Sequence, residues 1–452
     1  MADLAGASGR SEVALVVGFG TSGSAVARHL RDRGALVVAV DDAPTEDTRN
    51  QARDMAIEFF DCPDATLLAS LVESADVVVP SPGVPMHHPV FRLAADSNTP
   101  VRGEVELAFR WTRHPIVAVT GTNGKTSVTA LVTQMLEASG LRAVAAGNIG
   151  LPLSDAVRRD VDIVVAEVSS FQLWWTDTFR PLVAVWLNLA EDHLDWHPDL
   201  ESYVAAKARI WAHQQKGDTA VVNADDPWVV EKSVGVRSTV VTFGASVDAD
   251  YRLEGGMLRG PAGDIVAVHE LKRALPHDIS NALAASAAAL AAGATMEGVR
   301  TALLEFETLP HRLSLVSDAG GVRWYDDSKA TNPHAALAAA RSFDSVVLVA
   351  GGRNKGLDLG VLAEAADRIR AVVAIGESRH EVEAVFSGRR PVRTAASMDE
   401  AVALAYGLAV PGDVVLLSPG CASFDSYGSY AERGDDFSRA VHELFRSRER
   451  SL

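Results

Sequence analysis

The stretch Ile116-Val-Ala-Val-Thr-Gly-Thr-Asn-Gly-Lys-Thr-Ser127 decides how the centre of the chain folds. Its first residues are apolar or β-branched and predict a buried strand, and the loop that follows opens a helix. The loop ends in Gly-Lys-Thr like a Walker A loop, although Val119 stands where the first glycine of that motif would be. Backbone N–H groups and the helix N-terminus suit phosphates, Lys125 can reach the outer phosphates, and Thr126 can hold Mg²⁺. The stretch therefore predicts a strand, loop and helix that bind ATP.

Short apolar strands of the same kind recur outward from this stretch and alternate with helical segments. Because they are apolar on both faces, they predict parallel sheets covered by helices, and therefore an α/β fold. With 452 residues, and about 150 residues per domain, we expect three domains. Each should contain a mainly parallel, Rossmann-like sheet, and the central one should be a P-loop-type ATPase unit. The expected strands are Val13–Val17, Leu36–Val40, Val77–Pro80, Ile116–Thr120, Ile163–Glu167, Val183–Asn188, Ala220–Asn223, Val346–Ala350, Val372–Ile375 and Val414–Ser418.

Changes in the sequence pattern along the chain indicate the domain boundaries. We expect domains at residues 1–103, 104–310 and 311–452. Residues 251–268 contain glycine pairs and predict antiparallel strands or loops. The alanine-rich residues 281–294 predict a buried helix rather than a membrane span.

Charge and cysteine content exclude several classes of protein. The chain has 42 Lys and Arg against 59 Asp and Glu, a net charge of −17. An acidic surface repels nucleic acid and anionic membranes, so any anionic substrate needs local cations. Cys62 and Cys421 lie far apart in the sequence, which excludes a disulfide framework and fits the cytoplasm. No apolar run is long enough to span a membrane, and residues 1–10 lack the apolar centre of a signal peptide.

A second glycine loop lies near the N-terminus. Gly18-Phe-Gly20-Thr21-Ser22-Gly23 follows a strand, and the next strand ends at Asp41-Asp42, as in a dinucleotide-binding unit. Alone, this loop favours a nicotinamide or flavin enzyme, a UDP-sugar site, or a plain tight turn. The turn around Ser81 also follows a strand, where α/β sheets bind ligands. Two different phosphate loops in one chain indicate ATP together with a second phosphorylated ligand.

Candidate catalytic residues follow in the central third. Glu167 ends a strand and suits Mg²⁺ next to a phosphate loop. His193 and His197 are four residues apart, so zinc is an alternative, although the oxygen-rich surroundings favour Mg²⁺. Lys207 lies among Ala and Val on a predicted helix, which is unusual for a solvated lysine; a surface side chain along the helix is the ordinary alternative.

These residues together resemble the Mur ligase family, which also includes folylpolyglutamate synthases. The resemblance rests on Thr-Gly-Thr-Asn-Gly-Lys-Thr, Glu-x-Ser-Ser-Phe-Gln, Glu-Asp-His-Leu-Asp and the helix lysine, and it covers nearly the whole chain. It continues through Pro310-His311-Arg312, residues 326–332, residues 351–356 and residues 418–434. Asp278 and Tyr430 stand where we expect Asn and Phe. The N-terminal glycine loop and the Ser-Pro-Gly turn favour the branch that adds D-glutamate to UDP-N-acetylmuramoyl-L-alanine.

The resemblance implies the roles of individual residues. The catalytic residues would be Lys125, Glu167, His193 and Lys207. ATP would contact Gly121, Thr122, Asn123, Gly124, Lys125, Thr126, Ser127, Asn281, His311, Arg312 and Asp327. The UDP-sugar would contact Gly18, Gly20, Thr21, Ser22, Gly23, Asp41, Asp42, Ser81, Asn148, Ser169, Gln172 and His193. D-Glutamate would contact Lys329, Thr331, Lys355, Ser423 and Phe424. Two Mg²⁺ ions would be held by Thr126, Glu167, His193 and Lys207, the lysine as a carbamate.

The implied reaction is ATP-dependent amide formation through an acyl phosphate, in the cytoplasmic synthesis of peptidoglycan precursors. Three alternatives stay open from the sequence. The chain could be another Mur-type or folylpolyglutamate-type ligase with a different acceptor, a Rossmann dehydrogenase, or a regulator that binds ATP without turnover.

Overall fold

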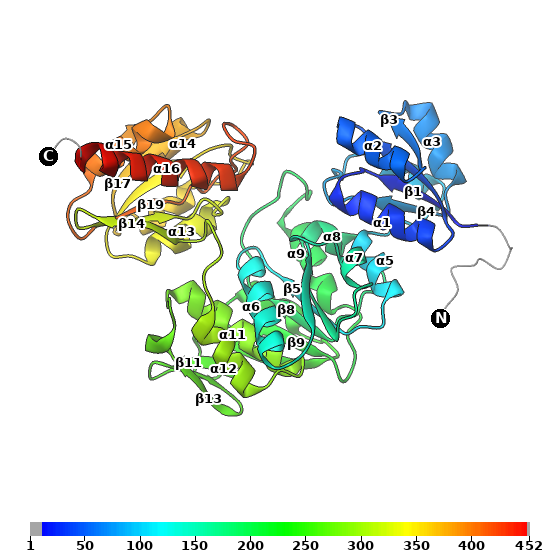
Figure 1. Cartoon of the computed structure of the whole chain (residues 1–452), viewed down its shortest axis with the longest axis horizontal. Helices are drawn as coiled ribbons and strands as arrows, with labels where there is room; N and C mark the ends of the chain where they lie inside the picture. Colours follow the sequence, from blue (N-terminus) through cyan, green and yellow to red (C-terminus); the bar gives the residue numbers. More distant parts are fainter. Residues whose placement is uncertain (1–10, 450–452) are drawn as a thin grey trace. The chain divides into compact units, whose positions relative to one another are not determined.

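The computed structural model describes residues 11–449, and three α/β domains follow one another along the chain (Figure 1). Residues 1–10, which bear on the expected absence of a signal peptide, lie outside the described residues. By internal contacts the chain divides into two units. The first unit contains the N-terminal and central domains. The second contains the C-terminal domain together with Ala190–Asp195 and Leu275–His277. No described helix is both long and apolar enough to cross a membrane.

The N-terminal domain is a four-stranded parallel sheet in the order β3-β2-β1-β4. The alternating strands and helices expected from the sequence are present. The strands are β1 (Val13–Val17), β2 (Leu36–Asp41), β3 (Glu58–Asp61) and β4 (Val77–Pro80); the helices are α1 (Thr21–Asp32), α2 (Glu46–Asp54), α3 (Ala65–Ser74) and α4 (Pro89–Asp96). The next helix, α5 (Glu104–Trp111), contributes Val105 and Ala108 to the core of the central domain.

The central domain contains a nine-stranded sheet in the order β13-β12-β11-β10-β9-β8-β5-β7-β6. Its strands pair in parallel from β6 to β11, and the last two pairings are antiparallel hairpins within residues 251–268, as expected. The strands are β5 (Ile116–Thr120), β6 (Ala143–Gly147), β7 (Ile163–Glu167), β8 (Val183–Trp186), β9 (Thr219–Asn223), β10 (Thr239–Gly244), β11 (Tyr251–Glu254), β12 (Met257–Gly260) and β13 (Gly263–Ala267). The helices are α6 (Lys125–Ala138), α7 (Leu153–Ala156), α8 (Ser170–Trp174), α9 (Leu200–Ala208), α10 (Pro227–Ser233), α11 (Pro276–Ala291) and α12 (Met296–Glu305), with short 3₁₀ turns at Arg209–Trp211 and Val268–Glu270.

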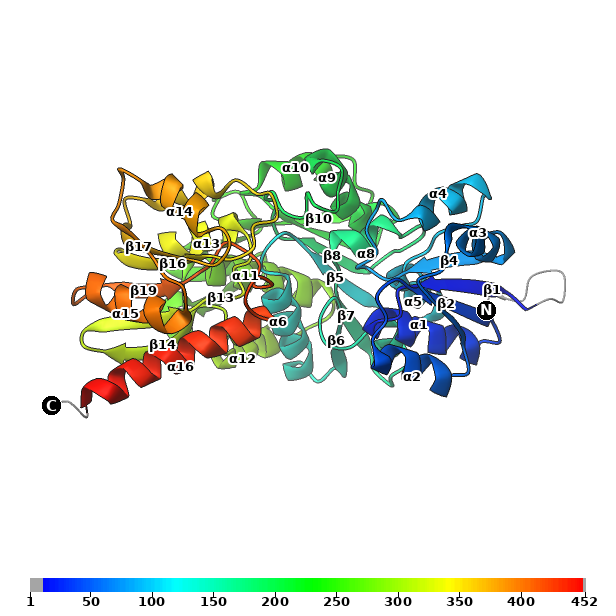
Figure 2. The ribbon, with the colours of Figure 1, turned by 90° about the horizontal axis from the view of Figure 1, so that it is seen from above.

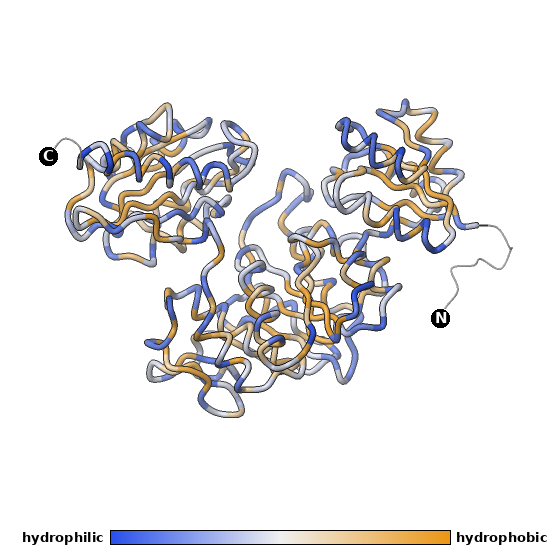
Figure 3. Tube along the Cα trace, viewed as in Figure 1, coloured by the Kyte–Doolittle hydropathy of each residue, from blue (hydrophilic) through white to orange (hydrophobic). Residues whose placement is uncertain are grey.

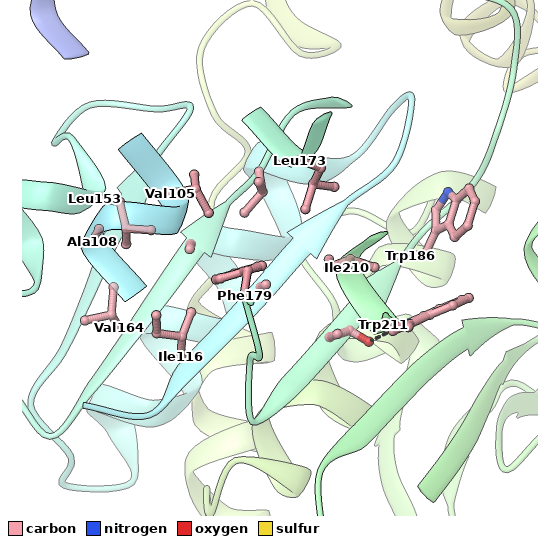
Figure 4. Packing of buried hydrophobic residues seen from close by; sticks show 14 of the residues in the cluster. Val105, Ala108, Ile116, Leu153, Val164, Leu173, Phe179, Trp186, Ile210 and Trp211 are labelled. Carbon is pink, nitrogen blue, oxygen red and sulfur yellow. Dashed lines mark hydrogen bonds between the residues drawn. The ribbon is translucent and has the colours of Figure 1, made fainter. Parts of the chain in front are cut away.

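The core of the central domain is formed by the apolar strands and the helices on them. Figure 4 shows Ile116 and Val164 from neighbouring strands packed near Val105 and Leu153 from helices. The Trp211 indole donates to the Ala184 carbonyl at 3.2 Å, so even this large side chain is buried with its N–H satisfied. Burial on both faces of the sheet explains why the strands are apolar without alternation.

The C-terminal domain has a six-stranded sheet in the order β14-β15-β19-β16-β17-β18, parallel except for the β14–β15 hairpin. The long α16 packs against β14 and β15, and its course along the domain is visible in Figure 2. Hydrophobic residues concentrate in the strands of each sheet (Figure 3). The strands are β14 (Ser314–Ala319), β15 (Val322–Asp326), β16 (Val346–Gly351), β17 (Ile369–Ile375), β18 (Val392–Thr394) and β19 (Val414–Leu417); the helices are α13 (Pro333–Arg341), α14 (Arg379–Phe386), α15 (Met398–Leu408) and α16 (Tyr430–Glu449), with a 3₁₀ helix at Leu359–Ala365.

Candidate active site

A cavity of about 630 Å³ lies in the first unit, at the carboxyl ends of β1, β2 and β4. Most of the residues predicted to contact the UDP-sugar line it: Gly18, Gly20, Thr21, Ser22, Asp41, Asp42, Ser81, Asn148 and Gln172. Gly23, Ser169 and His193 do not line it. The cavity has the size of a small-molecule site and the position at which α/β sheets bind nucleotides.

The glycine loop on this cavity is shaped by close backbone packing. Gly18 has φ +79°, a conformation that favours glycine, and its carbonyl accepts a hydrogen bond from Ser81 Oγ at 2.7 Å. A Cβ on Gly23 would lie 2.0 Å from the Gly18 oxygen, so α1 reaches the loop only because residue 23 has no side chain. Gly23 therefore shapes the loop from behind the cavity.

Ser169 and Gln172 form a capping box at the start of α8. Ser169 Oγ accepts from the Gln172 backbone N–H at 3.3 Å, and Gln172 Oε1 accepts from the Ser169 N–H at 3.0 Å. Both side chains therefore fix the helix start, and of the two only Gln172 lines the cavity. A ligand contact for Ser169 stays a prediction.

The second glycine loop joins β5 to α6. Gly124 has φ +86° and would carry its Cβ 2.7 Å from Asn281 Oδ1, so the predicted nucleotide residue Asn281 lies against the loop. Lys125 Nζ donates to the carbonyls of Gly121 and Thr122 at 2.8 and 2.9 Å. Predicted residues Thr126 and Ser127 lie in the first turn of α6, where backbone N–H groups are available to an anion.

Sequence reasoning missed Asn188, which holds this loop. Its Oδ1 accepts from the Asn123 N–H at 2.9 Å, its Nδ2 donates to the Asn123 carbonyl at 3.1 Å, and its own carbonyl accepts from the Thr122 N–H at 3.0 Å. The expected strand Val183–Asn188 was too long, because β8 ends at Trp186 and the chain turns toward the loop. A signal for this role was present in the sequence, since Asn188 comes two residues after the end of an apolar strand, β8, which pairs with β5.

Glu167 and Lys207 flank the same region of the first unit. Glu167 is buried at the end of β7; its Oε1 accepts from Asn148 Nδ2 at 2.8 Å, and its Oε2 accepts no hydrogen bond among the described residues. Lys207 is 1% exposed, and its Nζ donates to the Gly121 carbonyl at 2.9 Å and lies 4.6 Å from the centre of the Tyr203 ring. A buried carboxylate oxygen without a donor, next to a phosphate loop, fits a hard divalent cation such as Mg²⁺.

The zinc alternative at His193 and His197 finds no support. His197 is buried among aromatic rings, and its Nε2 lies 2.9 Å from Ser170 Oγ. Burial, together with the charge of Lys207, lowers its pKa to about 4. Among the described residues, no three His, Cys, Asp or Glu side chains gather as a zinc site would require.

His193 lies in the segment Ala190–Asp195, which belongs to the second unit. Its neighbour Asp192 accepts from Asn332 Nδ2 at 3.1 Å and pairs with Lys355 Nζ at 3.6 Å. His193 itself has φ +58°, and its Nε2 atom lies 3.6 Å from Asp192 Oδ2. Lys355, predicted for D-glutamate, therefore has a carboxylate partner from the Glu-Asp-His motif.

The remaining predicted residues of the second unit lie around β15 and the loop after β19. His311 Nδ1 pairs with Asp326 Oδ2 at 2.6 Å, and Lys329 Nζ lies 3.8 Å from the centre of the Tyr430 ring. Burial raises the pKa of Asp327 to about 7 against the opposing bond from Ser418, whose Oγ donates to it at 2.7 Å. Ser423 is buried, Thr331 is half-buried, and Phe424 is 63% exposed. Arg312 contributes a positive charge near Asp327.

Arg433 joins two of these loops and had no predicted role. It is 1% exposed, donates through Nε to Ser328 Oγ at 2.9 Å and through Nη2 to the Ser328 carbonyl at 2.9 Å. Its Nη1 donates to the carbonyls of Cys421 and Ala422 at 3.1 and 3.2 Å. Burial lowers its pKa to about 10, which leaves the guanidinium charged at neutral pH. The Glu-Arg-Gly sequence at 432–434 was part of the resemblance and could have indicated it.

The two departures from the family pattern also have partners. Asp278, in the first turn of α11, accepts two hydrogen bonds from the Arg273 guanidinium at 2.7 and 2.6 Å. Tyr430 offers its ring to Lys329. A bidentate pair is specific to a carboxylate, so Asp at position 278 is matched by Arg273.

Three family models match the chain in succession. They are the "Mur ligase MurD-like, N-terminal domain" over residues 12–103, the "Mur ligase middle domain" over residues 119–289 and the "Mur ligase, glutamate ligase domain" over residues 311–421. A UDP-N-acetylmuramoylalanine--D-glutamate ligase of Desulfosudis oleivorans is 45% identical over 449 residues, covering 95% of this chain and 96% of the relative. The chain belongs to the Mur ligase family. A second relative of the same printed name, from Frankia casuarinae, is 44% identical to this Mur ligase over 94% of the chain and 93% of the relative.

Solved structures have the same fold as this Mur ligase. The UDP-N-acetylmuramate-alanine ligase of Thermotoga maritima is 21% identical with a TM-score of 0.60, over 97% of this chain and all of that one. A pseudomurein peptide ligase from Methanothermus fervidus is 18% identical with a TM-score of 0.61, over 96% of this chain and all of that one. These likenesses confirm the expected α/β architecture of the Mur ligase.

Proposed function

We propose that this Mur ligase joins D-glutamate to UDP-N-acetylmuramoyl-L-alanine at the expense of ATP, in cytoplasmic peptidoglycan precursor synthesis. The proposal rests on near-full-length similarity to relatives that are named UDP-N-acetylmuramoylalanine--D-glutamate ligase. The two glycine loops support it, because a UDP-sugar and ATP each need a phosphate-binding loop. The domain boundaries at 103 and 310 and the assignment of one substrate to each domain belong to the same proposal.

The chemistry has two steps. An oxygen of the lactyl-alanine carboxylate attacks the γ-phosphorus of ATP, ADP leaves, and an acyl phosphate forms. The amine of D-glutamate then attacks the acyl carbon, loses a proton, and inorganic phosphate leaves as the amide bond forms. The first step brings two anions together, so positive charge at the phosphates lowers its barrier.

The chain's own groups would divide this work. Lys125 would exchange its hydrogen bonds to loop carbonyls for the outer phosphates of ATP. Asn188 holds the loop while this happens. Lys329, Lys355 and the buried hydroxyl of Ser423 would receive the two carboxylates of D-glutamate, with Thr331 and Phe424 completing that site.

Mg²⁺ is expected at Glu167 and Thr126, where it would neutralise phosphate charge. A second Mg²⁺ would use Glu167 and Lys207 of the first unit, the lysine as a carbamate. The buried, donor-free Oε2 of Glu167 supports a cation there. Burial of Lys207 supports a modified lysine, because an ammonium with so little contact with water carries a desolvation cost.

An acceptor screen tests the proposed function. Purified enzyme, ATP, Mg²⁺ and UDP-N-acetylmuramoyl-L-alanine are mixed with single amino acids, and phosphate release is measured. We expect release with D-glutamate and little with L-glutamate, D-aspartate, L-lysine or diaminopimelate. Release with another acceptor and none with D-glutamate would assign the chain to a different amide ligase. ATP binding without phosphate release under any condition would favour the alternative that the chain is a regulator that binds ATP without turnover.

A lysine variant tests the carbamate. We expect Lys207→Ala to lose most activity, Lys207→Glu to restore it only partly, and added bicarbonate to stimulate the wild type alone. Wild-type activity in Lys207→Ala would refute this role.

A further inference from the structure

Two adjacent aspartates at the end of β2 have different surroundings. Asp41 accepts a backbone N–H on each oxygen, from Phe19 at 2.7 Å and from Ala43 at 2.9 Å. It therefore ties the glycine loop to the end of β2. Asp42 also lines the cavity, but its side chain is 62% exposed and its only side-chain hydrogen bond among the described residues comes from His88, at 3.0 Å to Oδ2. One carboxylate is committed to the backbone, and the other presents a free oxygen at the cavity.

The ring of His88 is held in one orientation and one tautomer. It is the N-cap of α4, and its Nδ1 accepts the Val90 N–H at 3.2 Å. Because Nδ1 is the acceptor, the proton of the neutral ring is on Nε2, and Nε2 donates to Asp42. The ring is buried, and its edge packs near Phe91. No motif in the sequence indicates a role for this histidine.

The position of Asp42 determines what it can bind. A carboxylate at the end of the second strand, about 20 residues after a glycine loop, accepts hydrogen bonds from a nucleoside in dinucleotide-binding sheets. Glycine loops supply N–H donors for phosphates, whereas Asp42 is an acceptor only and would repel them. Its ligand must therefore be a neutral donor: a ribose hydroxyl or the imide N–H of a pyrimidine. Both belong to the nucleoside end of the ligand.

We propose that His88 is a positioning residue that fixes Asp42 as the acceptor for a nucleoside donor group in this cavity. The inference rests on the proposed placement of the UDP-sugar there. The hydrogen bond from Nε2–H fixes Oδ2, so that Oδ1 can face the ligand without losing side-chain freedom on binding. It also makes a phosphorylated ribose a poor ligand, because its charge would meet a fixed carboxylate.

Binding of UDP alone to the full-length enzyme, followed by calorimetry, tests the proposal. His88→Asn keeps an N-cap side chain but is too short to reach Asp42. We expect it to weaken UDP binding about tenfold, the scale of one hydrogen bond to a charged group. The neighbouring His87 is exposed, so His87→Asn is the matched control and should bind UDP like the wild type. We expect the KM for the UDP-sugar to rise in His88→Asn, with kcat and the KM values for ATP and D-glutamate unchanged.

A double variant and two analogues complete the test. His88→Asn combined with Asp42→Asn should bind UDP no more weakly than Asp42→Asn alone, because the histidine acts through the aspartate. If Asp42 accepts from the ribose, the wild type discriminates against 2′-deoxy-UDP and His88→Asn discriminates less. If it accepts from the imide, the same holds for N3-methyl-UDP.

The outcomes separate this inference from the proposed function. Wild-type UDP affinity in His88→Asn, full additivity of the two substitutions, or unchanged discrimination against both analogues would each overturn the role of His88. A wild-type enzyme that fails to bind UDP at all would instead overturn the placement of the UDP-sugar in this cavity. A fall in kcat with every KM value unchanged would indicate a smaller folded fraction and would also contradict the positioning role.

Discussion

Two glutamates on one turn of α5 are expected to respond very differently to the same substitution. Glu106 is fully buried, and its Oε2 accepts the N–H groups of Asp177, Thr178 and Phe179 at 2.8, 2.9 and 3.1 Å. Its Oε1 accepts from Thr178 Oγ1 and Arg110 Nε, both at 2.6 Å. Burial alone would raise the pKa of Glu106, but these hydrogen bonds outweigh it and lower the pKa.

Glu104, two residues earlier, lacks such compensation. Its Oε1 accepts from Ser154 N and Oγ at 3.0 and 2.9 Å, while its Oε2 is buried with no hydrogen-bond partner among the described residues. Burial therefore raises its pKa, against the bonds from Ser154. A neutral side chain suits this position, whereas position 106 requires a carboxylate.

The magnitudes follow from these contacts. Glu106→Gln can keep three backbone bonds to its amide oxygen, but each loses about 1 kcal/mol of charge assistance, about 3 kcal/mol in all. For a domain of this size that is a fall in Tm of about 6–12 °C. Glu104→Gln keeps the bonds from Ser154 and places its NH₂ where no bond existed, so its Tm should change by about 3 °C or less.

The pH dependence of the two variants should also differ in sign. Glu106 has a lowered folded pKa, so its contribution is present above its ordinary value of 4.5 and is lost as pH falls through the folded pKa. Glu104 has a raised folded pKa, so the wild type loses stability as pH rises through that pKa. Glu104→Gln should therefore improve relative to the wild type as pH rises above 4.5.

Tryptophan fluorescence during thermal unfolding measures both variants. Every tryptophan except Trp324 lies between residues 104 and 310, so the signal follows the domain that contains both glutamates. The two substitutions are chemically identical and serve as controls for each other. A loss in Glu104→Gln equal to or larger than that in Glu106→Gln would refute this assignment of the hydrogen bonds.

Three further substitutions test the loops around the candidate active site. Gly23→Ala should weaken UDP binding more than tenfold without changing ATP binding, because its Cβ would overlap the Gly18 carbonyl at 2.0 Å; equal UDP affinity by calorimetry would contradict the packing. Asn188→Ala removes both hydrogen bonds to the Asn123 backbone and should raise the KM for ATP about tenfold, whereas a change confined to the KM for D-glutamate would be inconsistent with its position. The lysine in Arg433→Lys cannot reproduce the planar set of hydrogen bonds that the guanidinium donates. We therefore expect a higher KM for D-glutamate and an unchanged Kd for UDP. An unaltered KM for D-glutamate would show that Arg433 does not support the acceptor site.

The fold was largely predictable because buried parallel strands are apolar on both faces. All of the strands expected from the sequence are present, with ends that differ by a few residues. The strands that were missed are β3, β6, β10, β14, β15 and β18, and four of them, β3, β6, β14 and β18, are edge strands of their sheets. β3 shows why an edge strand is hard to detect: it has only four residues and none of them is buried, so it lacks the apolar run of the inner strands.

The candidate site was predictable to the level of the loop but not of the atom. Glycine spacing located both glycine loops, since Gly18 and Gly124 have positive φ and Gly23 leaves no room for a Cβ. Nothing in the spacing indicates that Asp41 is committed to the backbone while its neighbour Asp42 faces the cavity. That difference comes from Phe19 and His88, which lie 22 residues before Asp41 and 46 residues after Asp42.

The same distinction explains why a net charge of −17 is compatible with three anionic substrates. The acids near the predicted substrate residues are engaged by specific donors: Asp326 by His311, Asp278 by Arg273 and Asp41 by the backbone N–H groups of Phe19 and Ala43. An acid held in this way shapes a loop and presents less free charge to an approaching ligand than its count suggests. Total charge therefore bears on long-range partners such as nucleic acid, whereas the affinity for a nucleotide depends on which acid keeps a free oxygen. Asp42 is such an acid, which makes its hydrogen bond from His88 the most informative one to break.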